Sequence, residues 1–82
     1  MYLVYGKDGC SACLQACHVL AMKGFDLEYK KLGKDYEVDE LFEVTDSMGL
    51  PRPRTFPQIF VVNGSEMEYI GGFDNLKEYL GE

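Results

Sequence analysis

The sequence predicts an α/β fold in which a four-stranded mixed sheet carries helices on both faces. Three observations lead to this prediction. Short apolar segments typical of strands alternate with longer segments whose apolar residues recur at helical spacing, in the order β-α-β-α-β-β-α. The first two strands are joined by a helix, so they are expected to run parallel with a right-handed crossover. The last two strands are joined by a tight turn, so they are expected to run antiparallel.

The first half of the chain supplies a β-α-β unit. Residues 1–6 are aromatic and β-branched and are apolar on both faces, which favours a central strand. Residues 7–24 begin with a turn and continue with apolar side chains at helical spacing, and Gly24 is a natural helix stop. Residues 25–30 alternate apolar and charged side chains with a period of two, as a half-buried strand does.

The second half supplies the rest of the sheet. Residues 32–49 carry apolar side chains at helical spacing and end in a glycine. Residues 50–57 hold all three prolines and predict a rigid loop. Residues 58–72 read as two strands around an Asn-Gly pair, a strong hairpin signal, and residues 73–82 as a short amphipathic helix.

Composition limits the class of protein. The 82 residues show no repeat and no linker, so residues 1–82 are expected to form a single domain. The net charge of -6 disfavours nucleic acid as a partner, because such a protein needs cations to replace phosphate counterions. No apolar run is long enough to span a membrane, and the first residues lack the regions of a signal peptide. The chain is therefore expected to stay in a reducing cytoplasm.

Three cysteines, Cys10, Cys13 and Cys17, lie within eight residues. An odd number so closely spaced does not form a disulfide framework, and in a reducing compartment a Cys-x-x-Cys pair is more often catalytic or metal-binding. A closed zinc site would have to add Cys17 and His18, whose side chains diverge by about 100° on a helix. A metal site is therefore disfavoured, and no metal ligands are predicted. Two inert core cysteines are disfavoured by their position at the junction of the first strand and helix.

The position of the pair predicts its chemistry. Cys10 falls at the junction of the first strand and helix, where free backbone N–H groups and the helix dipole favour thiolate over thiol. Lys7 adds a positive charge nearby. Cys13 follows one helical turn later, on the same face. Cys10 is expected to be the exposed nucleophile, and Cys13 the shielded thiol that resolves a mixed disulfide.

Three separated segments resemble those of glutaredoxins, in particular the short, phage-type dithiol members. KDGCSAC resembles the family's Lys-x-x-Cys-Pro-Tyr-Cys, RTFPQIFV its Arg-Thr-Val-Pro-x-Val-Phe, and IGGFDNL its Gly-Gly-x-Asp-Asp-Leu segment. The three occur in the family's order and span the whole chain. The family has the thioredoxin-like fold, which carries its redox motif at the first strand-to-helix junction.

The resemblance implies a glutathione site. In the family the peptide bond before the equivalent of Pro57 is cis, and Phe56 would offer its N–H and C=O to the cysteinyl backbone of glutathione. The alternative is a plain loop proline at the start of a strand. The implied contact residues are Lys7, Arg54, Thr55, Phe56, Pro57, Gly72, Phe73 and Asp74.

Charged groups would hold the two ends of glutathione. Lys7 and Arg54 would take the glycine carboxylate, with Arg52 a competitor for the same task; solvated surface charges are the alternative. At the start of the last helix, N–H groups near Phe73 would take the α-carboxylate and Asp74 the ammonium. Asp74 as a simple N-cap is the alternative there, and both roles are compatible.

The chain departs from the family at several positions. Ser11 and Ala12 replace the Pro-Tyr pair, so the turn should be looser and the redox potential changed. Phe73 replaces a family cysteine and is expected to pack. Cys17 is expected to be a buried small hydrophobe and His18 a solvated helix residue.

The predicted function is glutathione-dependent reduction of protein disulfides or glutathione mixed disulfides, by a monomer that uses glutathione as reductant. By resemblance, ribonucleotide reductase is a candidate partner. One alternative is a [2Fe–2S] dimer that acts as a cluster carrier. The other is a glutaredoxin-like protein that receives its electrons from thioredoxin reductase.

Overall fold

The computed structural model describes residues 1–82 and has the predicted β-α-β-α-β-β-α order. Its elements are β1 (Tyr2–Gly6), α1 (Ser11–Met22), β2 (Leu27–Lys31), α2 (Val38–Ser47), β3 (Gln58–Asn63), β4 (Glu66–Gly71) and α3 (Phe73–Tyr79). The strands form one mixed sheet in the order β2-β1-β3-β4. β1 runs parallel to β2 and antiparallel to β3, and β3 runs antiparallel to β4. The predicted fold class is confirmed.

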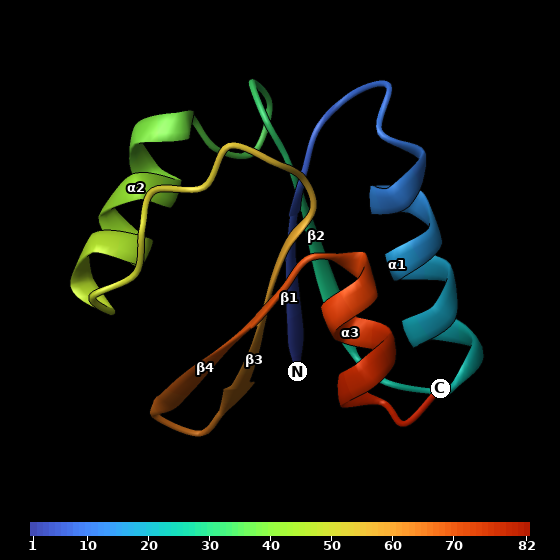
Figure 1. Ribbon diagram of the computed structural model, residues 1–82. Helices are drawn as coiled ribbons and strands as arrows, with labels where there is room; N and C mark the ends of the chain where they lie inside the picture. Colours follow the sequence, from blue (N-terminus) through green and yellow to red (C-terminus); the bar gives the residue numbers. More distant parts are fainter.

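β1 contributes side chains to both faces of the sheet, because successive side chains of a strand point to opposite sides. Tyr2 and Val4 belong to a core cluster that includes Leu20 of α1 and Leu76 of α3. The odd-numbered side chains of β1 belong to a second cluster, on the α2 side. Figure 1 shows the result, with α1 and α3 covering one face of the sheet and α2 the other.

β2 begins later than the sequence predicts. Residues 25 and 26 were expected to open this strand, but the N–H of Phe25 donates to the C=O of Leu20 (3.0 Å) and closes the end of α1. Gly24 makes this closure possible with a φ of +79°, which confirms it as the helix stop. The Phe25 ring packs against the Tyr2 ring, with centroids 5.2 Å apart.

α2 lies within the segment expected to hold a helix. The helical spacing of residues 32–49 starts at Val38, and the observed helix begins there. The segment before it is a turn in which the N–H of Gly33 donates to the C=O of Tyr36 (2.8 Å). The buried hydroxyl of Tyr36 donates to the C=O of Gly6, at the end of β1 (3.0 Å). The second of these bonds ties the turn to the end of β1.

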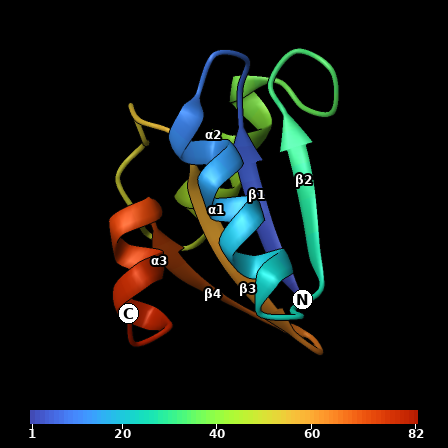
Figure 2. The same cartoon turned by 90° about the vertical axis from the view of Figure 1, so that its right-hand side faces the viewer.

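One end of the sheet gathers the segments that matter for function. The β1–α1 loop and the loop that leads into β3 lie at the end opposite both chain termini (Figure 1). Figure 2 shows α1 in front of the sheet, with β2 as the strand at one edge. None of the three helices has the length and apolar character that crossing a bilayer requires.

Candidate active site

Cys10 is the N-cap of α1. Its backbone is extended (φ -106°, ψ 99°), and its Sγ accepts the N–H of Cys13 at 3.1 Å. The two cysteines form a disulfide across one helical turn, with their Cα atoms 5.3 Å apart. The sulfur of Cys10 therefore lies where the unpaired N–H groups of the helix converge, as the sequence predicts.

Exposure differs between the three cysteines. Cys10 is half-buried, whereas Cys13 is fully buried at 0% exposure, so an incoming disulfide can reach only the first of the pair. Cys17 is free and half-buried, and burial raises the pKa of its thiol. A thiol held in its protonated form is a poor nucleophile, which agrees with the expected packing role. His18 is exposed.

The charges beside Cys10 are partly balanced. Lys31 of β2 pairs with Asp8 at 2.8 Å, and the hydrogen bond to Asp8 is the main cause of the raised pKa of Lys31. The first turn of α1 contains no acidic residue. Lys7 forms no ion pair, and its Nζ lies 5.3 Å from the centroid of the Phe56 ring. Lys7 is therefore the uncompensated cation next to the disulfide.

The loop before β3 carries the cis peptide bond that the resemblance implies, between Phe56 and Pro57. Pro57 is buried, and Phe56 takes part in none of the backbone hydrogen bonds formed outside helices and strands. A Cβ on Gly72 would lie 3.7 Å from the carbonyl oxygen of Pro57. The start of α3 is thus packed against this loop. Lys7 also contacts the loop, over the ring of Phe56.

Gln58 is a residue of this region that the sequence analysis missed. Its buried side chain donates from Nε2 to the C=O of Thr55 (2.8 Å) and accepts from the hydroxyl of Tyr69 through Oε1 (2.6 Å). Both ends of the amide are therefore satisfied, and the loop is tied to β4. The available signal was a glutamine at the start of an otherwise apolar strand.

The start of α3 differs in detail from the expectation. Gly72, not Asp74, is the N-cap, and its N–H donates to Oδ1 of Asn75 (3.0 Å). Asp74 is exposed in the first turn, 4.0 Å from the Nζ of Lys77. The N-cap interpretation of Asp74 is therefore wrong, and its carboxylate faces solvent. Phe73 is half-buried, and Lys77 lies over its ring.

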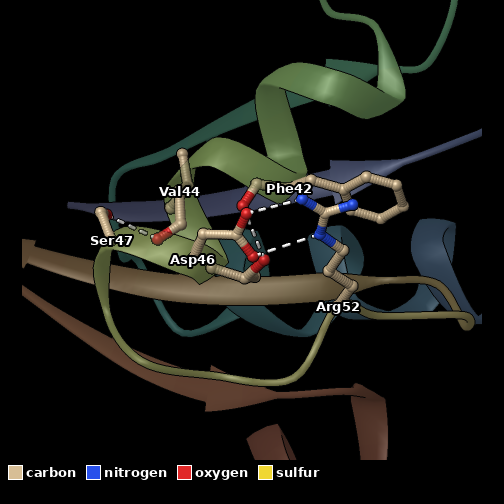
Figure 3. Close-up of polar contacts among 6 residues, drawn as sticks. Phe42, Val44, Asp46, Ser47 and Arg52 are labelled. Atoms are coloured by element: carbon tan, nitrogen blue, oxygen red, sulfur yellow. Dashed lines mark hydrogen bonds and ion pairs between the residues drawn. The ribbon is translucent and has the colours of Figure 1, made fainter.

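The two arginines of the proline-rich loop have different environments. Arg52 donates to both carboxylate oxygens of Asp46, from Nη2 (2.9 Å) and Nε (3.3 Å), and stacks over the ring of Phe42 (Figure 3). This bond lowers the pKa of Asp46. The neighbouring Ser47 hydroxyl donates to the C=O of Val44 (Figure 3). Arg54 is exposed and forms no ion pair, so it is the free cation of the two.

Known proteins with similar sequences point to one family. Residues 3–66 match the model of the Glutaredoxin family. The glutaredoxin of Enterobacteria phage T4 is 30% identical over 89 aligned residues, which cover 98% of this chain and 99% of that protein.

Solved structures agree with the fold. Reduced Escherichia coli glutaredoxin gives a TM-score of 0.71 at 24% identity, covering 96% of this chain and 91% of that one. A Brucella melitensis glutaredoxin gives a TM-score of 0.63 at 30% identity, covering 98% and 79%. The first likeness shows the thioredoxin-like fold, with the Cys10–Cys13 disulfide at its first strand-to-helix junction.

Proposed function

This chain belongs to the glutaredoxin family of thiol–disulfide oxidoreductases, with Cys10 and Cys13 as its dithiol pair, and we propose that it uses glutathione to reduce protein disulfides and glutathione mixed disulfides. The observation that carries the proposal is the place of Cys10. Cys10 is half-buried, and its sulfur caps a helix beside an unpaired lysine and a cis-proline loop with free backbone groups. Together they supply a nucleophile and a surface for a thiol tripeptide.

The chemistry is two successive thiol–disulfide exchanges. The Cys10 thiolate attacks the glutathione sulfur of a mixed disulfide, the new Cys10–glutathione bond forms, and the substrate thiolate leaves with the electron pair. A second glutathione thiolate then attacks the bound glutathione, which yields glutathione disulfide and restores Cys10. With a protein disulfide, Cys10 attacks one sulfur, the substrate S–S bond breaks, and the other substrate sulfur leaves as a thiolate. Cys13 then attacks Cys10, which releases the second substrate thiolate and leaves the Cys10–Cys13 disulfide. Two glutathione molecules reduce that disulfide in two further exchanges and leave as glutathione disulfide.

The proposed glutathione groove runs along the β3 side of Cys10. Phe56 supplies the backbone N–H and C=O that pair with the cysteinyl unit, flanked by Thr55 and Pro57. Lys7 and Arg54 attract the glycine carboxylate. At the other end, the N–H groups after Gly72, near Phe73, take the α-carboxylate, and Asp74 takes the ammonium. The exposure of Arg54 and Asp74 leaves both charges open to a ligand.

Steady-state reduction of hydroxyethyl disulfide tests the function. We expect turnover with glutathione and glutathione reductase, loss of turnover in Cys10→Ser, and retention of at least part of it in Cys13→Ser, because glutathione can resolve its own mixed disulfide. Turnover with thioredoxin reductase alone would remove glutathione from the proposal while keeping the dithiol. A coloured dimer without turnover from either electron source would favour the cluster carrier instead.

Two arginine variants test the groove itself. Arg54→Ala should lower kcat/KM for glutathione about tenfold, because a charge-assisted contact to a carboxylate is lost. Arg52→Ala is the matched control. It removes the same charge two residues away from Arg54, but the Arg52 side chain is already paired with Asp46. Its effect should stay within about twofold. Equal effects of the two variants would show that only the total positive charge of the loop matters, and not a direct contact from Arg54.

A further inference from the structure

A second feature adjoins Cys10 on its β2 side, and it shares Lys7 with the proposed glutathione groove. It is a pocket of about 460 Å³, and six residues of its lining define it: Lys7, Asp8, Cys10, Leu14, Tyr29 and Lys31. In the sheet, β2 and β3 flank β1 on opposite sides. The pocket lies toward β2, whereas the cis-proline loop leads into β3. A chain bonded to Cys10 can therefore meet both.

Two residues that line the pocket together with Cys10 offer apolar surface, Leu14 and Tyr29. Leu14 lies one helical turn after Cys10 and is 66% exposed. The ring of Tyr29 lies over Gly6, where an added Cβ would come within 2.6 Å of the tyrosine hydroxyl. The absence of a side chain at Gly6 thus lets the Tyr29 ring lie over the end of β1. Leu14 and Tyr29 both line the pocket beside Cys10.

The charged residues that line the pocket limit the kind of ligand that it can bind. Asp8 and Lys31 neutralise one another in an ion pair of 2.8 Å, so the pocket offers one unpaired charge, that of Lys7. A cationic group would be repelled there. Glutathione would gain little from the apolar surfaces, because it has no large apolar side chain. A volume of about 460 Å³ has room for one large side chain and the backbone next to it.

We propose that this pocket binds a large apolar side chain next to the reacting cysteine of a disulfide-bonded protein substrate. The proposal rests on the proposed function, since it concerns the substrate of the same nucleophile. It assigns Leu14 and Tyr29 as specificity-determining residues: they select protein disulfides by the residue beside the cysteine, whereas the β3 side binds glutathione.

Mixed-disulfide formation in a Cys13→Ser background tests, in the absence of glutathione, whether the pocket binds an apolar side chain of the substrate. The probes are two blocked peptides whose cysteine is flanked on both sides by leucine or by serine, each activated as a disulfide with 2-thiopyridine. The Cys10 thiolate attacks the peptide sulfur, the Cys10–peptide bond forms, and 2-thiopyridone leaves with the electron pair and is measured by its absorbance. We expect the leucine peptide to react about tenfold faster than the serine peptide, because apolar contacts in a binding pocket change rates by roughly this factor.

Leu14→Ser should reduce the rate ratio of the two peptides to about twofold or less. Met22→Ser is the matched control, because Met22 is an equally exposed apolar residue of the same helix (74%) that does not line the pocket, and it should leave the ratio unchanged. A ratio near one in the parent protein, or an unchanged ratio in Leu14→Ser, would overturn the proposal.

A third probe separates this proposal from the proposed function. Glutathione activated with the same leaving group should react equally fast with the parent and with Leu14→Ser. If its rate falls as much as that of the leucine peptide, the pocket is part of a glutathione site and the proposal is wrong. Failure of glutathione-driven turnover with hydroxyethyl disulfide would contradict the proposed function alone, because the peptide ratio needs no glutathione.

Discussion

Cys10 shows how one side chain joins structure to chemistry. Helix N-caps are usually Ser, Thr, Asp or Asn, whose oxygen accepts an N–H of the first turn. Here a sulfur does so, with the N–H of Cys13 as donor. A thiolate accepts such a bond more strongly than a thiol, because the bond becomes charge-assisted. The cap that begins α1 therefore also favours the form of Cys10 that attacks disulfides.

Tyr36 shows a residue whose contribution to stability depends on pH. Its side chain is 2% exposed, donates to the C=O of Gly6, and meets the ring of Tyr5 edge-on at 4.9 Å. Burial is the main cause that raises the pKa of Tyr36 from its ordinary value of 10 to about 12. Ionisation is thus easier in the unfolded chain than in the folded protein.

Alkaline unfolding tests this linkage. Below pH 10 the contribution of Tyr36 is fully present, and it falls as the pH rises toward 12, because only the unfolded chain then ionises. With a pKa of about 12, the loss at pH 11 is roughly 1.4 kcal/mol. Tyr36→Phe should lose about 1 kcal/mol at pH 7 with its hydrogen bond, but show a smaller further loss at pH 11.

Urea denaturation of both proteins at pH 7 and pH 11 provides the measurement. The other tyrosines are common to both chains, so their effect cancels in the comparison. If the wild type and Tyr36→Phe lose equal stability on going to pH 11, Tyr36 does not carry the alkaline sensitivity.

At the scale of elements, the junction of β4 and α3 depends on two adjacent glycines with different constraints. Gly71 is buried, has a φ of +120°, and a Cβ there would lie 2.6 Å from Oδ1 of Asn75. Gly72 has an ordinary φ of -90°, and its Cβ would make only ordinary contacts, with the carbonyl oxygen of Pro57 at 3.7 Å and with Oδ1 of Asn75 at 3.9 Å. The backbone turn itself therefore requires only the first glycine.

We expect Gly71→Ala to lower the free energy of unfolding by roughly 1–3 kcal/mol, through backbone strain and displacement of Asn75. Gly72→Ala, the matched control, should cost less than about 1 kcal/mol and act mainly on glutathione binding. Equilibrium denaturation in urea separates the two. A Gly72→Ala protein less stable than Gly71→Ala would show that packing against Pro57, not the backbone turn, limits this junction.

The elements also show which features can be predicted from sequence. Local patterns were enough for the order of the strands and helices, the hairpin, and the helix ends at Gly24 and Gly49. The start of β2 was misplaced, because the backbone hydrogen bond from Phe25 to Leu20 holds residue 25 at the end of α1. The bond from Tyr36 to Gly6 joins distant residues, so local patterns do not predict it.

Within the candidate site, sequence located the reactive pair and the cis-proline loop. Gln58 and Asn75 escaped notice because their bonds to backbone groups exist only once the loop and the helix are folded. The resemblance favoured Arg54 for the carboxylate and left Arg52 as a competitor. The ion pair of Arg52 with Asp46 distinguishes them in the structure.

On the scale of the whole molecule, the two core clusters lie on opposite faces of one sheet and share its central strands. Val4 and Ile59 contribute to the cluster under α1 and α3, whereas Leu3 and Phe60 contribute to the cluster under α2. If the packing on one face of the sheet is lost, the same strands that support the cluster on the other face become exposed. A small chain organised in this way is expected to unfold as one cooperative unit.

Amide hydrogen exchange tests this organisation. β1 and β3 are paired on both sides and buried, so their amides should exchange only through global unfolding and be the slowest in the chain. β2 and β4 each have one unpaired edge, and their amides should exchange about tenfold or more faster through local opening. Exchange followed residue by residue by NMR gives the comparison, and a stability measurement on the same sample gives the global limit. If the amides of β4 prove as protected as those of β3, the edge does not open separately, and the β4–α3 junction beside the candidate site is as rigid as the central strands. Slower exchange in β4 than in β1 would contradict the assignment of the shared strands as the most stable part of the molecule.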